Sequence, residues 1–186
     1  VDEGQIDIVC GGSQKAVSAP PGLTFVTASD AAMKAMEERK TPIASFYANI
    51  LVFKDYYKNL WFPYTMPISD IYGLRQALEN IKNDPDMVKR HTEIAKKTRE
   101  ALTRSGLKLY ADNGYSNTVT VFSIPGGVTA EQILTAMRQD YNIMLAGSFD
   151  VMAGEVIRIG HMGYNCTEEN MKETLEALDA VLRELG

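Results

Sequence analysis

One lysine, Lys15, stands in the segment GGSQKAVSAPPG, residues 11–22, directly after an apolar stretch. A nucleophilic lysine must lose its proton near neutral pH, although its ordinary pKa is about 10.4. Burial and neighbouring positive charge lower this pKa, as in lysines that form Schiff bases. The Gly-Gly pair lets the backbone approach a ligand, and Ser13 and Gln14 can donate hydrogen bonds. The pattern fits a Schiff-base lysine, and from spacing alone it also fits a solvated lysine at a strand end.

Two strands and a helix are expected to hold this loop. The strands read IDIVCGG (6–12), with a buried pattern, and LTFVTAS (23–29). Ser29 or Asp30 then caps a helix, AAMKAMEERK, which Thr41-Pro42 should stop. Residues 43–67 show no sustained period and are expected to form a connection with short helices.

The second half of the chain alternates helices and strands. We expect helices over IYGLRQALENIKN, MVKRHTEIAKKTREALTRSG with Gly106 as its C-cap, residues 129–140, and a last amphipathic helix opened by Thr167-Glu168. Strands are expected at LKLYA, TVTVFSI, NIMLA and EVIRIGHMG. This order predicts an α+β domain.

Composition excludes several classes of function. The chain has 186 residues, 45% of them hydrophobic, and a net charge of -5, which argues against nucleic-acid binding. Cys10 and Cys166 belong to no CxxC pattern, so neither a disulfide scaffold nor structural zinc is expected. We expect a reducing, cytoplasmic compartment instead. No apolar run reaches the roughly 18 residues of a membrane span. A small molecule or a protein is the expected partner.

Several segments together resemble one family. GSQKAVSAPPG after the IDI strand resembles the lysine region of class V aminotransferases of fold type I, the pyridoxal-phosphate enzymes that include alanine:glyoxylate, serine:pyruvate and serine:glyoxylate aminotransferases. PYTMPISDIYGLRQALE, LTRSGLKLYADNGYSNTVTVFSIPGG and EVIRIGHMGYNCTEENM resemble later segments of that family, in the same order.

The resemblance implies roles for the residues around the lysine. Lys15 would carry pyridoxal 5'-phosphate as a Schiff base and move a proton between the substrate carbon and the cofactor. Gln14 and Ser13 would contact the cofactor, although Gln14 could equally satisfy the loop backbone. Tyr64 and Thr65 lie where the family places a phosphate contact that crosses to the other subunit of a dimer. Phe62 stands where some relatives carry a tyrosine, which favours the Thr65 hydroxyl.

Arg158 resembles the residue that binds the substrate carboxylate in this family. A guanidinium can bind a carboxylate through two hydrogen bonds, although an arginine in an apolar strand can also be an edge residue with a salt-bridge partner. His161, three residues later, should face the opposite side as a core histidine. His91 is expected on a solvated helix face, and two isolated histidines predict no metal site.

The resemblance also predicts the organisation of the chain. Residues 1–67 would be the end of the large cofactor-binding domain with its connector, and residues 68–186 a small α+β C-terminal domain with a long interdomain helix. The family's ring-stacking aromatic residue, its pyridine-binding aspartate and its phosphate-binding turn lie upstream of the lysine strand. The chain therefore resembles a C-terminal half, which we expect to be inactive without an N-terminal half from the same or a separate chain.

The resulting hypothesis is a homodimeric aminotransferase that moves the amino group of alanine or serine to glyoxylate or pyruvate. Two alternatives remain open. One is a catalytically inert fragment or interaction chain that keeps the fold; the other is an aminotransferase acting on phosphoserine or 2-aminoethylphosphonate, which would need basic residues for a second anion. A cysteine desulfurase is disfavoured because Cys166 does not lie in a loop that resembles theirs.

Overall fold

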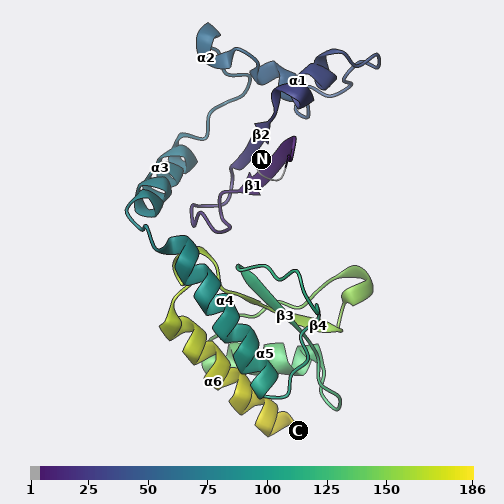
Figure 1. The fold of residues 1–186 in the computed structure, drawn as a ribbon, viewed down its shortest axis with the longest axis vertical. Coiled ribbons are helices and arrows are strands. Elements are labelled where there is room, and N and C mark those ends of the chain that lie inside the picture. The colour runs from purple at the N-terminus through teal and green to yellow at the C-terminus, as the bar shows by residue number, and fades with distance from the viewer. Residues whose placement is uncertain (1–4) are drawn as a thin grey trace. The chain divides into compact units, whose positions relative to one another are not determined.

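The computed structural model describes residues 5–186, and the chain divides into two compact units. Unit 1 is Val1–Asn80 and unit 2 is Ile81–Gly186. Figure 1 shows a two-stranded ribbon with short helices in the first unit, and long helices beside a second ribbon in the other. Among the helices of the described residues, none is long and apolar enough to cross a membrane. The sequence had suggested a domain boundary between residues 67 and 68.

Unit 1 is built on an antiparallel hairpin. Strand β1 (Ile8–Gly12) pairs with β2 (Thr24–Ala28), with Gly12 opposite Thr24 at the end where the Lys15 loop begins. Both strands lie where the sequence predicted them, but the expected burial of the first is wrong: Ile8 is 46% exposed. A ribbon of two strands, with no third strand paired to it among the described residues, has little surface with which to bury both its faces.

Helix α1 (Asp30–Glu37) follows β2 directly. Ser29 is its N-cap, with its Oγ accepting the Ala32 N–H at 3.0 Å. The same Oγ donates to Asp7 Oδ1 at 2.6 Å, which ties the helix start to the residue before β1. The helix ends before the predicted Thr41-Pro42 stop, because the chain leaves helical geometry after the C-cap Glu38.

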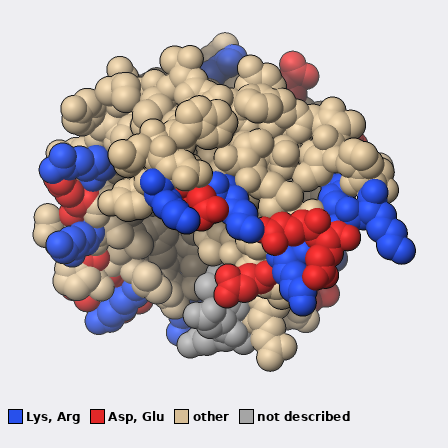
Figure 2. All heavy atoms as spheres, turned by 90° about the horizontal axis from the view of Figure 1, so that it is seen from above, with Lys and Arg blue, Asp and Glu red and all other residues tan. Residues whose placement is uncertain are grey.

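The connection after α1 contains two short helices, as the sequence suggested. These are η2 (Ile50–Phe53) and α2 (Tyr56–Asn59), and helix α3 (Ile68–Lys82) follows them. Aromatic rings pack edge-on or stacked around Tyr64, and the cluster consists of Phe46, Tyr47, Phe53, Phe62 and Tyr64. From the side on which α1 and α2 lie in Figure 1, Figure 2 shows a broad area without charged side chains.

Unit 2 is a ribbon covered by three helices. Strand β3 (Val119–Ser123) pairs antiparallel with β4 (Val156–Gly160), placing Val121 opposite Arg158. Helices α4 (Met87–Arg104), α5 (Ala130–Tyr141) and α6 (Glu168–Leu185) pack together and against the ribbon (Figure 1). Two short helices, η3 (Asp150–Met152) and η4 (Gly163–Asn165), flank β4.

The hydrophobic core of the described residues lies in unit 2. Its fully buried side chains come from both strands and all three long helices, and include Ile94, Leu102, Phe122, Ile133, Met137, Ile157, Ile159, Leu178 and Val181. Alternation along β4 directs Ile157 and Ile159 into this core and leaves Arg158 on the other face.

Two predicted strands shrink to single bridging residues. LKLYA pairs only through Leu109 with Phe122, and NIMLA only through Ala146 with Arg158. Alternating apolar residues favour a strand, but a ladder of hydrogen bonds needs a partner strand that stays in register over several residues. Here each segment forms one bridging residue pair and then leaves the neighbouring strand. The bridges still place Ala146 beside β4, where it helps to position Arg158.

Candidate active site

The Lys15 loop is held by backbone hydrogen bonds across the β1–β2 hairpin. Ser13 N–H donates to Leu23 O and Ala19 N–H donates to Ser13 O, both at 3.0 Å. Within the loop, Lys15 N–H donates to Gly12 O at 3.2 Å. Residues 13–23 are therefore a closed, internally bonded loop that presents Lys15 from a defined backbone.

The Ser13 hydroxyl is already engaged inside this loop. Ser13 is fully buried, and its Oγ donates to Pro20 O at 2.6 Å and accepts the Leu23 N–H at 3.3 Å. These bonds hold the double-proline segment against the end of β1. In this structure the hydroxyl closes the loop around Lys15, and the cofactor contact that the sequence suggested for Ser13 stays a prediction.

Gln14 folds back over the preceding glycine. A Cβ added at Gly12 would lie 2.7 Å from Gln14 Oε1, so the side-chain amide occupies the space that a larger residue would need. Gln14 itself is exposed and its amide makes no hydrogen bond within residues 5–186. It is thus free to meet a ligand beside Lys15.

The side chain of Lys15 is exposed and unpaired. Among the described residues, no carboxylate forms an ion pair with its amine and no acceptor binds it. By contrast, Lys54 of the same unit is paired with Glu37, which raises the pKa of Lys54. A lysine with no acceptor of its own is available for a covalent partner.

Tyr64 and Thr65 differ in what their hydroxyls do. Tyr64 is half-buried in the aromatic cluster, and its hydroxyl lies 3.2 Å from Phe46 O and 3.3 Å from Tyr47 O. Thr65 is exposed, and within residues 5–186 its hydroxyl has no partner. Of the two residues predicted to contact the phosphate, Thr65 is the one whose hydroxyl makes no hydrogen bond to the described residues.

Arg158 is held on β4 by the segment that contains Ala146. Its backbone N–H donates to Ala146 O at 2.7 Å, and the Ala146 N–H donates to Arg158 O at 3.3 Å. Its side-chain Nε donates to Gly147 O at 2.8 Å. The residue is half-buried and, in the part of the chain that the structure describes, no carboxylate pairs with it. The guanidinium is therefore fixed in direction while both terminal nitrogens remain free.

The histidines have roles that the sequence predicted for only one of them. His161 is fully buried and its Nε2 lies 2.8 Å from Thr120 Oγ1, which confirms a core histidine. Burial lowers the pKa of His161 and favours its neutral form. The expectation of a solvated His91 is wrong, because this side chain is only 6% exposed.

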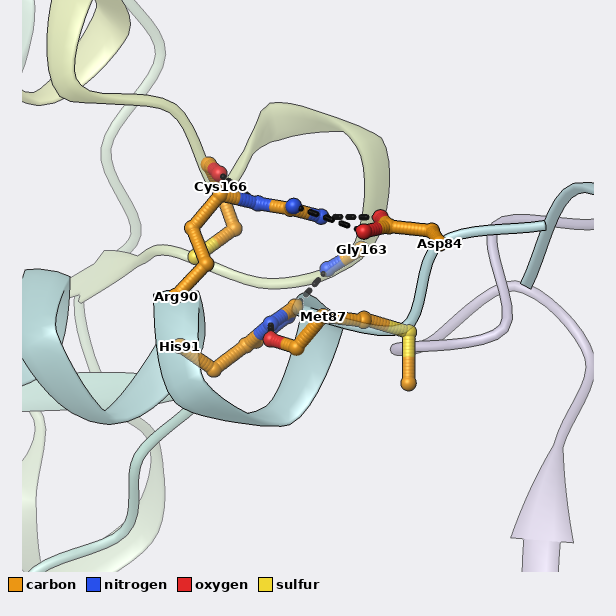
Figure 3. A network of polar contacts seen from close by, with 6 residues as sticks. All are labelled: Asp84, Met87, Arg90, His91, Gly163 and Cys166. Carbon is orange, nitrogen blue, oxygen red and sulfur yellow. Dashed lines mark hydrogen bonds and ion pairs between the residues drawn. The ribbon is translucent and has the colours of Figure 1, made fainter. Parts of the chain in front are cut away.

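His91 and its neighbour Arg90 anchor the loop after β4 (Figure 3). The Nδ1 of His91 lies 2.7 Å from Met87 O, which must accept, so Nδ1 carries the proton. The Nε2 then accepts the Gly163 N–H at 2.9 Å. Arg90 donates through Nε to Cys166 O at 3.1 Å and through a terminal nitrogen to Asp84 Oδ1 at 3.0 Å. This ion pair lowers the pKa of Asp84.

Cysteine and metal chemistry find no support in the described residues. Burial raises the pKa of the Cys166 thiol, which makes it a poor nucleophile. Residues 5–186 contain no group of three or more His, Cys, Asp or Glu side chains that could hold a metal ion. Lys15 in unit 1 and Arg158 in unit 2 stay the predicted chemistry-bearing residues.

Comparison with known proteins identifies the family. The model of the aminotransferase class-V family matches residues 1–172, so the chain belongs to that family. Membership implies pyridoxal phosphate as the cofactor, and an exposed, unpaired Lys15 on a closed loop fits that group.

Individual relatives agree with this placement. An uncharacterized aminotransferase of Methanocaldococcus jannaschii is 36% identical, covering 100% of this chain and 49% of the relative. The serine--glyoxylate aminotransferase of Arabidopsis thaliana is 35% identical, covering 100% of this chain and 47% of its own. The crystal structure of alanine--glyoxylate aminotransferase from Nostoc sp. is similar with a TM-score of 0.90 at 30% identity, covering 98% of this chain and 49% of that one. The chain spans about half the length of the relatives it matches.

Sequence reasoning missed one neighbour of the arginine. The ring centroid of Phe149 lies 5.9 Å from Arg158 Cζ. Nine residues separate the two, and no periodic pattern connects them, because the η3 turn brings the ring back to β4. The contact with the Gly147 carbonyl could not be found from the sequence either, because any residue type can supply a backbone acceptor.

Proposed function

We propose that the protein is an aminotransferase that moves the amino group of a small amino acid, alanine or serine, to glyoxylate or pyruvate. The observation that carries this proposal is the unpaired amine of Lys15 on a closed hairpin loop, in a chain of the class-V family. The named relatives that act on serine, alanine and glyoxylate support the choice of substrates.

Lys15 is the residue that holds the cofactor covalently. When the amino substrate replaces it, the freed Nζ is the group that moves the proton from the substrate α-carbon. The loop bonds of Ser13 keep the lysine backbone in place during this exchange. Gln14 and Thr65, whose polar groups have no partner within residues 5–186, are the further proposed cofactor contacts from this unit.

Arg158 binds the substrate carboxylate. Its Nε is occupied by Gly147 O, so the two terminal nitrogens form the fork that a carboxylate meets with two hydrogen bonds. Since the arginine has no carboxylate partner in the described part of the chain, the substrate does not have to displace one.

The cofactor, when bound, supplies the electron sink that stabilises negative charge on the substrate carbon. Residues 68–186 are proposed as the small C-terminal domain of the fold. The complete site is proposed to need an N-terminal half and a second copy of the chain in addition. On this proposal the isolated half does not turn over substrate. The cytoplasm, where thiols such as the exposed Cys10 stay reduced, is the proposed compartment.

Reductive trapping tests the proposal. The protein is incubated with pyridoxal phosphate and reduced with borohydride, and its intact mass and peptide map are compared before and after. We expect one phosphopyridoxyl adduct, on Lys15, which Lys15→Ala abolishes. Lys40→Ala is the matched control, since Lys40 is another exposed lysine of unit 1, and it should keep the adduct.

The amino donor is tested in the reconstituted protein, with the N-terminal half and a second copy of the chain present. Alanine or serine should convert the bound cofactor to its amine form, whereas phosphoserine and 2-aminoethylphosphonate should not. Conversion only by the phosphorus-containing donors would refute the proposed substrates. A folded protein that never forms the Lys15 adduct, with or without an added N-terminal half, would establish an inert chain instead.

A further inference from the structure

The guanidinium of Arg158 has an aromatic neighbour in addition to its carbonyl anchor. Its Nε–H donates to Gly147 O at 2.8 Å, and its Cζ lies 5.9 Å from the ring centroid of Phe149. A guanidinium carries five N–H donors, so four remain on the two terminal nitrogens. An anion bound to these nitrogens would lie at about 2.7–2.9 Å from them, on the same guanidinium that has the ring as its neighbour.

The backbone around Phe149 forms a closed turn that carries the ring. Phe149 is extended and is followed by Asp150, which has a φ of 53°, a left-handed conformation that aspartate and asparagine adopt more readily than other non-glycine residues. The turn is closed by the Met152 N–H, which donates to Phe149 O at 3.3 Å, and by the Ala153 N–H, which donates to Asp150 O at 3.1 Å. Phe149 nevertheless leaves 69% of its surface exposed, so it does not serve as a core residue of unit 2.

We propose that Phe149 is a specificity-determining residue, which forms an apolar wall beside the carboxylate-binding guanidinium and selects monocarboxylic amino and 2-oxo acids over those with a second carboxylate. This inference rests on the proposed role of Arg158 as the carboxylate-binding residue.

Two physical effects give the ring this role. The face of an aromatic ring attracts a guanidinium, which restricts the fork to one orientation before the substrate arrives. A second carboxylate directed at the ring would lose water without gaining a hydrogen-bond partner, and such desolvation is unfavourable. A methyl or hydroxymethyl side chain meets no such penalty.

Steady-state kinetics of the holoenzyme test the proposal. Phe149→Ala is expected to raise KM for pyruvate about two- to fivefold with kcat unchanged. This fold-change corresponds to the free energy of an exposed cation–aromatic contact. The ratio of kcat/KM for 2-oxovalerate to that for 2-oxoglutarate, two acids of equal carbon number, should fall. Phe149→Tyr, which keeps the ring, should keep the wild-type KM for pyruvate, and Phe149→Leu should keep the ratio while raising KM.

The controls separate this inference from the proposed function. Tyr115→Ala removes a ring 4.8 Å from the guanidinium carbon of a different arginine, Arg99, and should change neither KM nor the ratio. Arg158→Lys should raise KM strongly; an unchanged KM there would remove the proposed carboxylate-binding residue itself. A raised KM in Arg158→Lys together with wild-type values in Phe149→Ala would overturn the role of Phe149 alone.

A readout without turnover completes the test. The Arg158 Nε–H signal in a nitrogen-proton NMR spectrum should be protected from exchange by Gly147 in the wild type and in Phe149→Ala alike. Added pyruvate should shift this signal at lower concentration in the wild type than in the variant. Equal titration curves for the two proteins would overturn the inference.

Discussion

Replacing His91 by alanine should destabilise unit 2 and release the loop that follows β4. His91 is buried, and its Nε2 accepts the N–H of the equally buried Gly163 at 2.9 Å. Alanine leaves that N–H without an acceptor, at a cost of about 1–3 kcal/mol, and removes a second hydrogen bond, to Met87 O, worth about 1 kcal/mol. The Met87 carbonyl lies within the first turn of α4 and can be solvated or bonded along the helix, so we expect about 2–3 kcal/mol in total.

Urea unfolding followed by circular dichroism measures this loss as a lower midpoint at an unchanged slope. His91→Gln should recover most of the stability, because its amide oxygen can accept the Gly163 N–H. Lys96→Ala is the control: Lys96 is exposed on the same helix and forms only a 3.8 Å surface ion pair with Glu100, so a change below about 0.5 kcal/mol is expected.

Hydrogen exchange gives a local check of the same geometry. The Gly163 amide should be protected in the wild type and in His91→Gln, and should exchange rapidly in His91→Ala. An unprotected Gly163 amide in the wild type, or equal destabilisation by glutamine and alanine, would refute the hydrogen bond as the cause.

Two further predictions concern the same unit. Burial lowers the pKa of His161 below its ordinary value of 6.5, so the unfolded state binds more protons than the folded state near that pH. The contribution of His161 to the free energy of unfolding should therefore be full above pH 6.5 and decrease as the pH falls towards about 5. Urea midpoints measured across this range should show the decrease, and His161→Gln should flatten it. Asn142 ends α5 with a φ of 54°, so Asn142→Ala should lower the free energy of unfolding by about 1 kcal/mol, whereas Asn142→Gly should stay within a few tenths.

The sequence singled out candidate site residues but gave little information about their surroundings. Lys15 and Arg158 stand out because few residue types can form a Schiff base or bind a carboxylate with two bonds. The partners of Arg158 could not be found in this way: Gly147 acts through its backbone, and Phe149 reaches the arginine through a turn with a left-handed residue. Resemblance to the class-V family added the cofactor, which residue types alone did not specify.

His91 shows a signal that was present in the sequence and was misread. The charged residues around it suggested a solvated helix face. Yet Ile94, Thr98 and Leu102 follow it at three, seven and eleven residues, the spacing of one buried helix face. A histidine on such a face is stabilised by partners for its ring nitrogens, and here the Met87 carbonyl and the Gly163 N–H provide them.

The two proposed site residues lie in units with different internal support. Arg158 stands on a strand whose neighbouring residues, Ile157 and Ile159, belong to a core shared by three helices. Lys15 stands on a two-stranded ribbon that has no such core, in a unit where Leu60 and Tyr47 are more than 80% exposed. Two-stranded ribbons are marginal by themselves in water. The side chain proposed to bind the carboxylate is thus preorganised by packing within its own unit, whereas the lysine depends on hydrogen bonds inside its loop, above all those of the buried Ser13 hydroxyl.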